Sequence, residues 1–272
     1  MVLKSKLAFL KRKIRGYKSC LVAFSGGLDS AFLLKVCSLV LAKENILAVT
    51  AVSASYPRGE LVKARLLAKD MGVRFKVIKT TELNNKKFTD NSVLRCYFCK
   101  KELFLKLAAL ARKNKLNAVL DASNTTDKSD YRPGNLAKKE LKVKSPLLES
   151  GFSKKDIRLQ SKLLGLANWN KPPLACLASR VPYGTKITVS LLRRIDKAES
   201  YLNGLGFSQV RVRHYNGLCR LEVEKKNFNR LLRRRKAIVE KLKNLGYNYI
   251  TLDLEGYRTG SLNEVINEKS IS

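Results

Sequence analysis

Two groups of residues in this sequence have the types and spacing needed for chemistry. One is the glycine-rich loop Ser25-Gly26-Gly27-Leu28-Asp29-Ser30, which follows an apolar run and precedes a helical pattern. Glycines let the backbone close around a phosphate, and the start of a helix offers free N–H groups and a positive dipole end. Ser25 and Ser30 can donate hydroxyl hydrogen bonds. Asp29 would repel phosphate directly and is better suited to Mg²⁺ that bridges the phosphates.

The other group is three cysteines, Cys96, Cys99 and Cys176, which lie among polar and turn residues where packing does not explain them. Cys96 and Cys99 open a predicted helix, so they could bind one metal centre or form a redox pair. Three cysteines on one iron–sulfur cluster would leave one iron open to carry an extra sulfide. Alternatively, Cys176 alone is the sulfur donor, because the neighbouring Arg180 would stabilise its thiolate.

The order of residues separates the loop 25–30 from the commoner phosphate-binding loops. It has neither the G-x-x-x-x-G-K-[ST] pattern of ordinary NTPases nor the G-x-G-x-x-G pattern of dinucleotide-binding domains. It resembles S-G-G-x-D-S, the PP-loop signature of the ATP pyrophosphatase superfamily. This resemblance implies that ATP is cleaved between its α and β phosphates and that a substrate is adenylylated. It also implies that backbone groups around residues 51–55 bind adenine.

A second polar loop, at 121–134, follows the fourth predicted strand. Ligands of open parallel sheets bind at the carboxyl ends of the strands, where this loop is expected to lie. Asn124 and Asp127 could contact the nucleotide or its metal, and Arg132 could pair with a phosphate.

The elements that must position these residues change along the chain. Apolar, β-branched runs alternate with helical patterns at 20–24, 46–52, 73–79 and 117–123, which predicts an α/β fold with a parallel sheet and helices on both faces. After a Pro-rich stretch, the last hundred residues predict a smaller α+β unit. Its elements are a helix at 190–205, a hairpin at 209–224 around Asn216-Gly217, a helix at 227–245 and a strand at 249–254. We expect two domains, 1–168 and 169–272.

Composition limits the kind of protein. The 272 residues are 45% hydrophobic, which is enough for a packed core, and no apolar run reaches the roughly 18 residues of a membrane span. The basic N-terminus predicts an amphipathic helix, not a signal peptide, so a cytoplasmic protein is expected. The net charge of +33 would attract nucleic acid, but the excess is spread along the whole chain, which favours a solvated basic surface. Cys20, Cys37 and Cys219 lie in apolar runs and are expected to pack as small hydrophobes.

Several longer segments carry a more specific resemblance. They are SGGLDS (25–30), NSVLRCYFCK (91–100), DASNTTDKSDYRPG (121–134), CLASRVPYGTKIT (176–188), GFSQVRVRHYNGLCRLEV (206–223) and YITLDLEGYRTGSLNE (249–264). In order and spacing they resemble the LarE family over nearly the whole chain. The resemblance implies an ATP-dependent sulfur transferase of nickel-pincer nucleotide synthesis. Such an enzyme adenylylates a carboxylate of pyridinium-3,5-biscarboxylic acid mononucleotide and converts it to a thiocarboxylate. It also implies a homo-oligomer with ATP and Mg²⁺.

The resemblance implies roles for individual residues. In one family mechanism the cysteine at the position of Cys176 gives up its own sulfur and becomes dehydroalanine. In the other, three cysteines hold a [4Fe-4S] cluster that carries sulfide. Because cysteine stands at all three positions, Cys96, Cys99 and Cys176, we expect the cluster mechanism, with the sacrificial use of Cys176 left open. Asp29 completes the expected catalytic set.

The phosphate of the substrate is expected on Ser179, Arg180, Arg211 and Arg213, again by resemblance. Arg211 and Arg213 alternate onto one face of a predicted strand, and guanidinium groups suit phosphate. Glu199 and Glu222 are weaker candidates for a metal or substrate contact.

Two other enzyme classes share parts of this pattern. A tRNA thiolase of the PP-loop class can use a three-cysteine cluster, and the basic charge suits RNA; it would bind tRNA in a salt-sensitive way and yield a 2-thiolated product. The C-terminal half shows no RNA-binding module, so nucleic acid is not the expected partner. An amidating synthetase of the NAD or GMP synthetase kind would leave the three cysteines without a role.

Overall fold

The computed structural model describes residues 3–129, 133–173 and 175–266. The chain divides into two compact units. The first comprises residues up to 53, 58–88 and 93–174, and the second comprises 54–57, 89–92 and the chain from 175 onward. The chain therefore enters the second unit twice before it stays there. The domain boundary that we expected between residues 168 and 169 stays a prediction.

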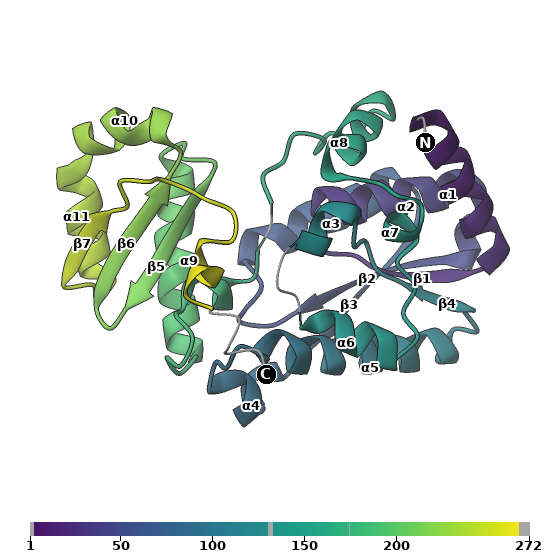
Figure 1. Ribbon diagram of the computed structural model, residues 1–272, viewed down its shortest axis with the longest axis horizontal. Coiled ribbons are helices and arrows are strands. Elements are labelled where there is room, and N and C mark those ends of the chain that lie inside the picture. The colour runs from purple at the N-terminus through teal and green to yellow at the C-terminus, as the bar shows by residue number, and fades with distance from the viewer. Residues whose placement is uncertain (1–2, 130–132, 174, 267–272) are drawn as a thin grey trace. The chain divides into compact units, whose positions relative to one another are not determined.

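The first unit is built on a parallel sheet with the strand order β3-β2-β1-β4 (Figure 1). The strands are β1 (Cys20–Ala23), β2 (Ile46–Val52), β3 (Arg74–Lys79) and β4 (Ala118–Leu120). In the register, Cys20 of β1 lies opposite Ile46 of β2 and opposite Ala118 of β4. The predicted α/β architecture with a parallel sheet is thus confirmed.

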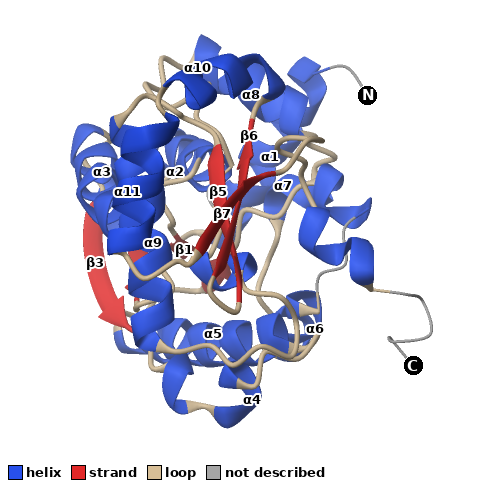
Figure 2. Ribbon diagram, turned by 90° about the vertical axis from the view of Figure 1, so that its left-hand side faces the viewer, coloured by secondary structure: helices blue, strands red, loops and turns tan. Residues whose placement is uncertain are grey.

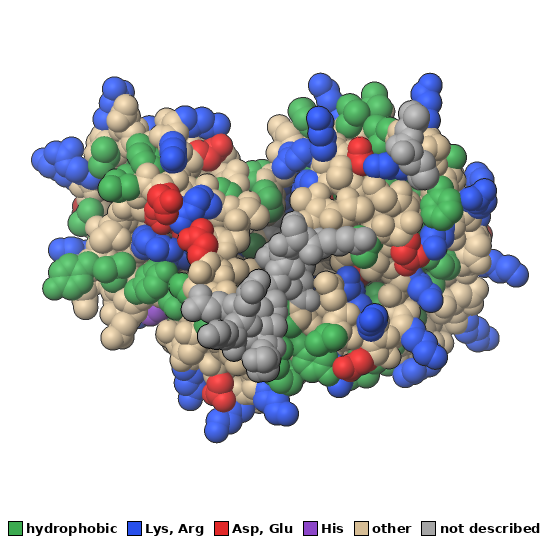
Figure 3. Space-filling view, viewed as in Figure 1, with side chains coloured by type: hydrophobic (Ala, Val, Ile, Leu, Met, Phe, Trp, Pro, Cys, Tyr) green, Lys and Arg blue, Asp and Glu red, His purple; other side chains and the backbone are tan. Residues whose placement is uncertain are grey.

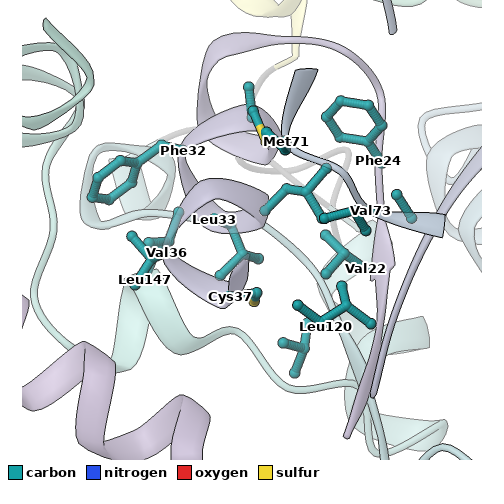
Figure 4. Close-up of a cluster of buried hydrophobic side chains, with 14 of the residues drawn as sticks. Val22, Phe24, Phe32, Leu33, Val36, Cys37, Met71, Val73, Leu120 and Leu147 are labelled. Carbon is teal, nitrogen blue, oxygen red and sulfur yellow. The ribbon is translucent and has the colours of Figure 1, made fainter. Parts of the chain in front are cut away.

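Helices cover both faces of this sheet, as its β-branched runs predicted. The helices of this part of the chain are α1 (Leu3–Tyr17), α2 (Leu28–Val40), α3 (Arg58–Asp70), α4 (Lys86–Thr89), α5 (Arg95–Lys113), α6 (Gly134–Glu140), α7 (Pro146–Glu149) and α8 (Lys154–Leu163). One core joins the sheet to α1, α2, α3, α7 and α8 and includes Val22, Phe32 and Leu147 (Figure 4). A separate core joins the opposite face to α5 and α6. Cys20 and Cys37 are fully buried, as expected.

The second unit contains a three-stranded sheet in the order β5-β6-β7. Its elements are α9 (Val189–Gly204), β5 (Val210–Tyr215), β6 (Leu218–Val223), α10 (Phe228–Arg233), α11 (Arg235–Asn244) and β7 (Tyr249–Leu252). β5 and β6 form the predicted antiparallel hairpin, and β7 runs parallel to β6. Asn216 and Gly217 both have positive φ, 43° and 92°, which is the conformation that a two-residue hairpin turn requires. Helices α9 and α11 lie together on one side of the sheet (Figures 1 and 2).

One predicted helix is divided. We expected a single helix at 227–245, but Arg234 adopts φ −98° and ψ 10° between α10 and α11. The segment contains neither glycine nor proline, so no residue type marked the interruption.

The basic residues lie over the surface of both units. Figure 3 shows Lys and Arg side chains spread across this face of each unit, not gathered in one tail. Within the described ranges, no helix is both long and apolar enough to cross a membrane.

Candidate functional site

The glycine-rich loop joins β1 to α2, as predicted. Gly26 has a φ of +72°, and a Cβ atom there would lie 2.9 Å from the Cβ of Ala64, so glycine is required for both reasons. The Ser30 hydroxyl donates to the carbonyl of Gly27 at 3.1 Å and accepts the N–H of the first loop residue at 3.2 Å. These bonds close the loop at the start of α2. A closed loop at a helix N-terminus is the geometry of an anion site.

Asp29 lies in the first turn of α2 and is held by a lysine that the sequence did not single out. The ammonium of Lys154 lies 2.7 and 2.6 Å from the two carboxylate oxygens of Asp29. Lys154 is the first residue of α8, whose N-cap Ser153 forms a capping box with Asp156. Serine is a preferred N-cap residue, so the start of α8 has a local signal in the sequence. It gave no sign that Lys154 would meet a residue 125 positions earlier. Carboxylate oxygens are ligands that Mg²⁺ prefers, so Asp29 has the right chemistry for the metal, but Mg²⁺ would have to displace the Lys154 ammonium from one of these oxygens.

The loop after β4 is tied to the same helix. The side chain of Asn124 is buried, and its oxygen accepts the N–H of Thr126 at 3.0 Å. The backbone N–H of Asn124 donates to the Asp127 carboxylate at 3.0 Å, and the Thr126 hydroxyl accepts the backbone N–H of Lys154 at 3.0 Å. These contacts link Asn124 and Asp127 to the start of α8. Arg132, predicted to pair with a phosphate, lies outside the described residues.

Cys96 and Cys99 lie in the first turns of α5, where a spacing of three residues places both on one helix face. Cys96 is exposed and Cys99 is half-buried. The hydroxyl of Tyr97, between them, donates to Glu140 of α6 at 2.8 Å and accepts from Lys101 at 2.8 Å. This network braces the cysteine-bearing end of α5 against α6.

Cys176 belongs to the second unit and is exposed, directly before the short 3-10 helix Leu177–Arg180. The described ranges contain no group of three or more His, Cys, Asp or Glu side chains arranged to hold a metal. Cys96 is exposed and Cys99 half-buried in the first unit, so both thiols are accessible on α5, and the iron–sulfur centre that we expected on all three cysteines stays a prediction.

Arg180 fixes the backbone at Cys176. Its guanidinium donates to both oxygens of Glu199, each at 2.8 Å, and to the carbonyl of Cys176 at 3.0 Å. The Ser179 hydroxyl also donates to that carbonyl, at 2.7 Å. Burial opposes the charge of Arg180, but the Glu199 carboxylate outweighs it and raises the Arg180 pKa. The predicted phosphate residues Ser179 and Arg180 thus lie beside the predicted sulfur-transfer cysteine.

Arg213 has a comparable buried partner. It donates to the two oxygens of Glu222 at 2.8 and 2.9 Å, and to the Ser261 hydroxyl at 2.7 Å. Arg211, on the same face of β5, donates to the Val210 carbonyl at 2.9 Å. Burial and the neighbouring Arg180 charge lower the pKa of Arg211.

These side chains form an arginine cluster, defined here as Arg180, Arg211, Arg213, Glu199 and Glu222. It combines three guanidinium groups with two carboxylates, so its net charge is positive and suits a phosphate. Glu199 and Glu222, which the sequence made weak candidates, are the buried counter-ions of the cluster.

Comparisons with known proteins show which family the chain is similar to. A family described as NAD synthase matches residues 2–116, which include the glycine-rich loop. An uncharacterized protein of Synechocystis sp. is 42% identical over 98% of this chain and 100% of its own length. The pyridinium-3,5-bisthiocarboxylic acid mononucleotide synthase of Lactiplantibacillus plantarum is 35% identical over 99% of this chain and 98% of its own length.

The chain belongs to the LarE family.

Membership of the LarE family makes the chain an enzyme of the PP-loop class, and that class implies ATP and Mg²⁺. The resemblance to amidating enzymes covers a smaller part. An NH₃-dependent NAD⁺ synthetase of Methanococcoides burtonii is 35% identical over 68 residues, which is 25% of this chain. The similarity to the Lactiplantibacillus plantarum synthase, in contrast, extends through the second unit as well.

Proposed function

We propose that this LarE family member is an ATP-dependent sulfur transferase of nickel-pincer nucleotide synthesis. It adenylylates a carboxylate of pyridinium-3,5-biscarboxylic acid mononucleotide and converts it to a thiocarboxylate. The observation that carries this proposal is the similarity, over nearly the full length, to a protein named pyridinium-3,5-bisthiocarboxylic acid mononucleotide synthase. That similarity includes the cysteine-bearing second unit as well as the phosphate loop.

In the first step, ATP lies with its phosphates on the loop 25–30. A carboxylate oxygen of the substrate attacks the α phosphorus, the bond to the bridging oxygen of the β phosphate breaks, and pyrophosphate leaves. Loop N–H groups and the Lys154 ammonium stabilise the charge that develops on the leaving group. Asp29 would hold Mg²⁺, which when bound offsets the charge of the phosphates. Asn124 and Asp127 contribute to the nucleotide site.

The substrate is held by its own phosphate. The arginine cluster, with the Ser179 hydroxyl, binds this group by charge-assisted hydrogen bonds. Because Arg180 and Ser179 also fix the Cys176 carbonyl, phosphate binding and the position of Cys176 depend on the same side chains.

In the second step, a sulfur nucleophile attacks the acyl carbon of the adenylate, the carbon–oxygen bond breaks and AMP leaves. If Cys176 supplies the sulfur itself, its thiolate forms a thioester. Loss of its Cα proton and cleavage of its Cβ–Sγ bond then leave dehydroalanine and the thiocarboxylate. We favour Cys96, Cys99 and Cys176 as ligands of a [4Fe-4S] cluster, which when bound would supply a reusable site for sulfide.

One experiment tests both the reaction and the sulfur source. Protein reconstituted without oxygen is assayed for iron, sulfide and its visible spectrum, as wild type and as Cys176→Ala. It is then incubated with ATP and the biscarboxylic mononucleotide, and product and protein masses are measured. A thiocarboxylate product with unchanged protein mass and iron bound only in the wild type supports the cluster mechanism. A thiocarboxylate with loss of one sulfur from Cys176 supports the sacrificial mechanism. Release of AMP with no thiocarboxylate in any preparation would contradict the proposed function.

The remaining expectations belong to the same proposal. A small nucleotide substrate, a homo-oligomer and a cytoplasmic location are proposed from the similarity to the LarE family. Size measurement of the purified protein by light scattering tests the oligomer directly.

A further inference from the structure

A short segment between α8 and the second unit lies against the phosphate loop. This segment, Asn168–Lys171, is called the strap below. The side-chain amide of Asn168 donates to the carbonyl of Gly26 at 3.4 Å, and the ammonium of Lys171 donates to the same carbonyl at 3.2 Å. Two donors from the strap therefore converge on one peptide oxygen of the loop.

The strap is itself held in place by α8. Arg158 donates to the carbonyls of Trp169 at 3.5 Å and of Lys171 at 3.3 Å. The ammonium of Lys162 lies 5.0 Å from the centre of the Trp169 ring. The backbone of the strap thus has fixed partners, so the position of Lys171 does not depend on its own side chain alone.

Lys171 has a carboxylate partner beside the loop. Its ammonium pairs with Glu60 of α3, whose other oxygen accepts from Lys63 at 3.1 Å. Burial raises the pKa of Glu60, but the two lysines outweigh it and lower the pKa overall. Only 17% of the Lys171 side chain is exposed, whereas 62% of the Lys63 side chain is exposed.

The orientation of one peptide unit follows from these contacts. The peptide bond is planar, so the carbonyl of Gly26 and the N–H of Gly27 point in opposite directions. With the carbonyl held toward the strap, the N–H points into the loop, where it donates to the Ser25 hydroxyl at 3.3 Å. Glycine on both sides leaves this peptide free of the side-chain sterics that would otherwise fix it. An anion requires the N–H to face inward.

We propose that Lys171, assisted by Asn168, is a positioning residue that holds the Gly26–Gly27 peptide in its phosphate-binding orientation. The proposal rests on the proposed function in one respect, that the anion bound by the loop is the ATP phosphate group. Because Lys171 acts through the loop, its loss weakens ATP binding and leaves the rate at saturating ATP nearly unchanged.

The test compares Lys171→Met with Lys63→Met. Both variants remove one lysine partner of Glu60 and one positive charge, but only Lys171 contacts the loop. Binding of a non-hydrolysable ATP analogue is measured by calorimetry, and KM and kcat are measured from pyrophosphate release. Loss of a hydrogen bond from a charged donor predicts about tenfold weaker binding and an equal rise in KM for Lys171→Met. Lys63→Met should stay close to the wild type, and Lys171→Gln, which keeps a donor, should lose less than the methionine variant.

Thermal melting of each variant separates loss of folding from loss of positioning. Equal affinities in Lys171→Met and Lys63→Met would overturn the inference, as would a fall in kcat with unchanged KM. Where Lys171→Met does not fold, the comparison of Lys171→Gln with Lys63→Met decides by the same criteria. A wild-type protein that binds no ATP analogue would instead overturn the proposed function, so the two failures are distinguishable.

Discussion

Replacement of Lys154 by methionine tests whether α8 takes part in the ATP step. The ammonium of Lys154 lies 2.7 and 2.6 Å from the oxygens of Asp29, and each side chain is 26% exposed. At an effective dielectric constant of about 20, unit charges about 4 Å apart interact by about 4 kcal/mol. Partial exposure and desolvation reduce the net contribution of such a pair to folding to about 1 kcal/mol. The variant should therefore fold.

The effect on activity is expected to be larger than the effect on stability. Removal of one preorganised charge-stabilising group from a transition state typically lowers a rate by about 10²-fold. We therefore expect Lys154→Met to lower kcat for pyrophosphate release by about that factor while its melting temperature changes by only a few degrees. Lys155→Met is the matched control, because Lys155 is the next residue of α8 and is exposed. Equal rates in the two variants would refute a role for Lys154 in pyrophosphate departure.

Three further changes probe the second unit. Cys176→Ser should still release pyrophosphate but form no thiocarboxylate by mass spectrometry; product formed at the wild-type rate would exclude both sulfur-transfer mechanisms. Glu222→Ala should leave the buried Arg213 charge uncompensated and lower the unfolding free energy by about 3–5 kcal/mol in denaturant titration, and a loss below about 1 kcal/mol would contradict that account. Burial and Arg194 lower the pKa of His214. His214 is therefore protonated more readily in the unfolded chain than in the folded one. The free energy of unfolding should keep its full value above about pH 6.5 and fall as the pH drops below it. In His214→Gln the melting temperature should depend less on pH below that value. An unchanged pH dependence would mean that another group causes the loss of stability.

Features of the sequence that act locally were predictable. The glycine-rich loop lies between a buried strand and a helix because apolar runs, glycines and helix starts are each encoded within a few residues. The Asn216-Gly217 turn similarly marked the β5–β6 hairpin. Burial of Cys20, Cys37 and Cys219 followed from the apolar residues around them.

Contacts between distant segments were not predictable in the same way. The pairing of Lys154 with Asp29 and the contact of Lys171 with Gly26 join residues that are 125 and 145 positions apart. No local pattern distinguishes these lysines from the many that are solvated. The region of the Arg213 partner was easier to predict, because the two-residue turn fixes a register that places Arg211 opposite Glu222, and Glu222 is the diagonal neighbour with which Arg213 pairs. Charged residues at every second position of the two strands were the signal in the sequence for a buried ion-pair network.

The second unit is assembled from separate stretches of the gene, and this has an evolutionary consequence. The side chain of Asn91 is fully buried and donates to the carbonyls of Pro182 at 2.6 Å and Thr185 at 2.9 Å. The carbonyl of Ser55 accepts the N–H of Leu177 at 3.0 Å, next to Cys176. A single recombination event that exchanged everything after residue 174 would leave Asn91 and Ser55 in one parent sequence. Their hydrogen-bond partners after residue 174 would then come from the other parent. The two halves are therefore expected to be inherited together, and a new substrate specificity should arise by substitutions within the chain more readily than by exchange of its C-terminal half.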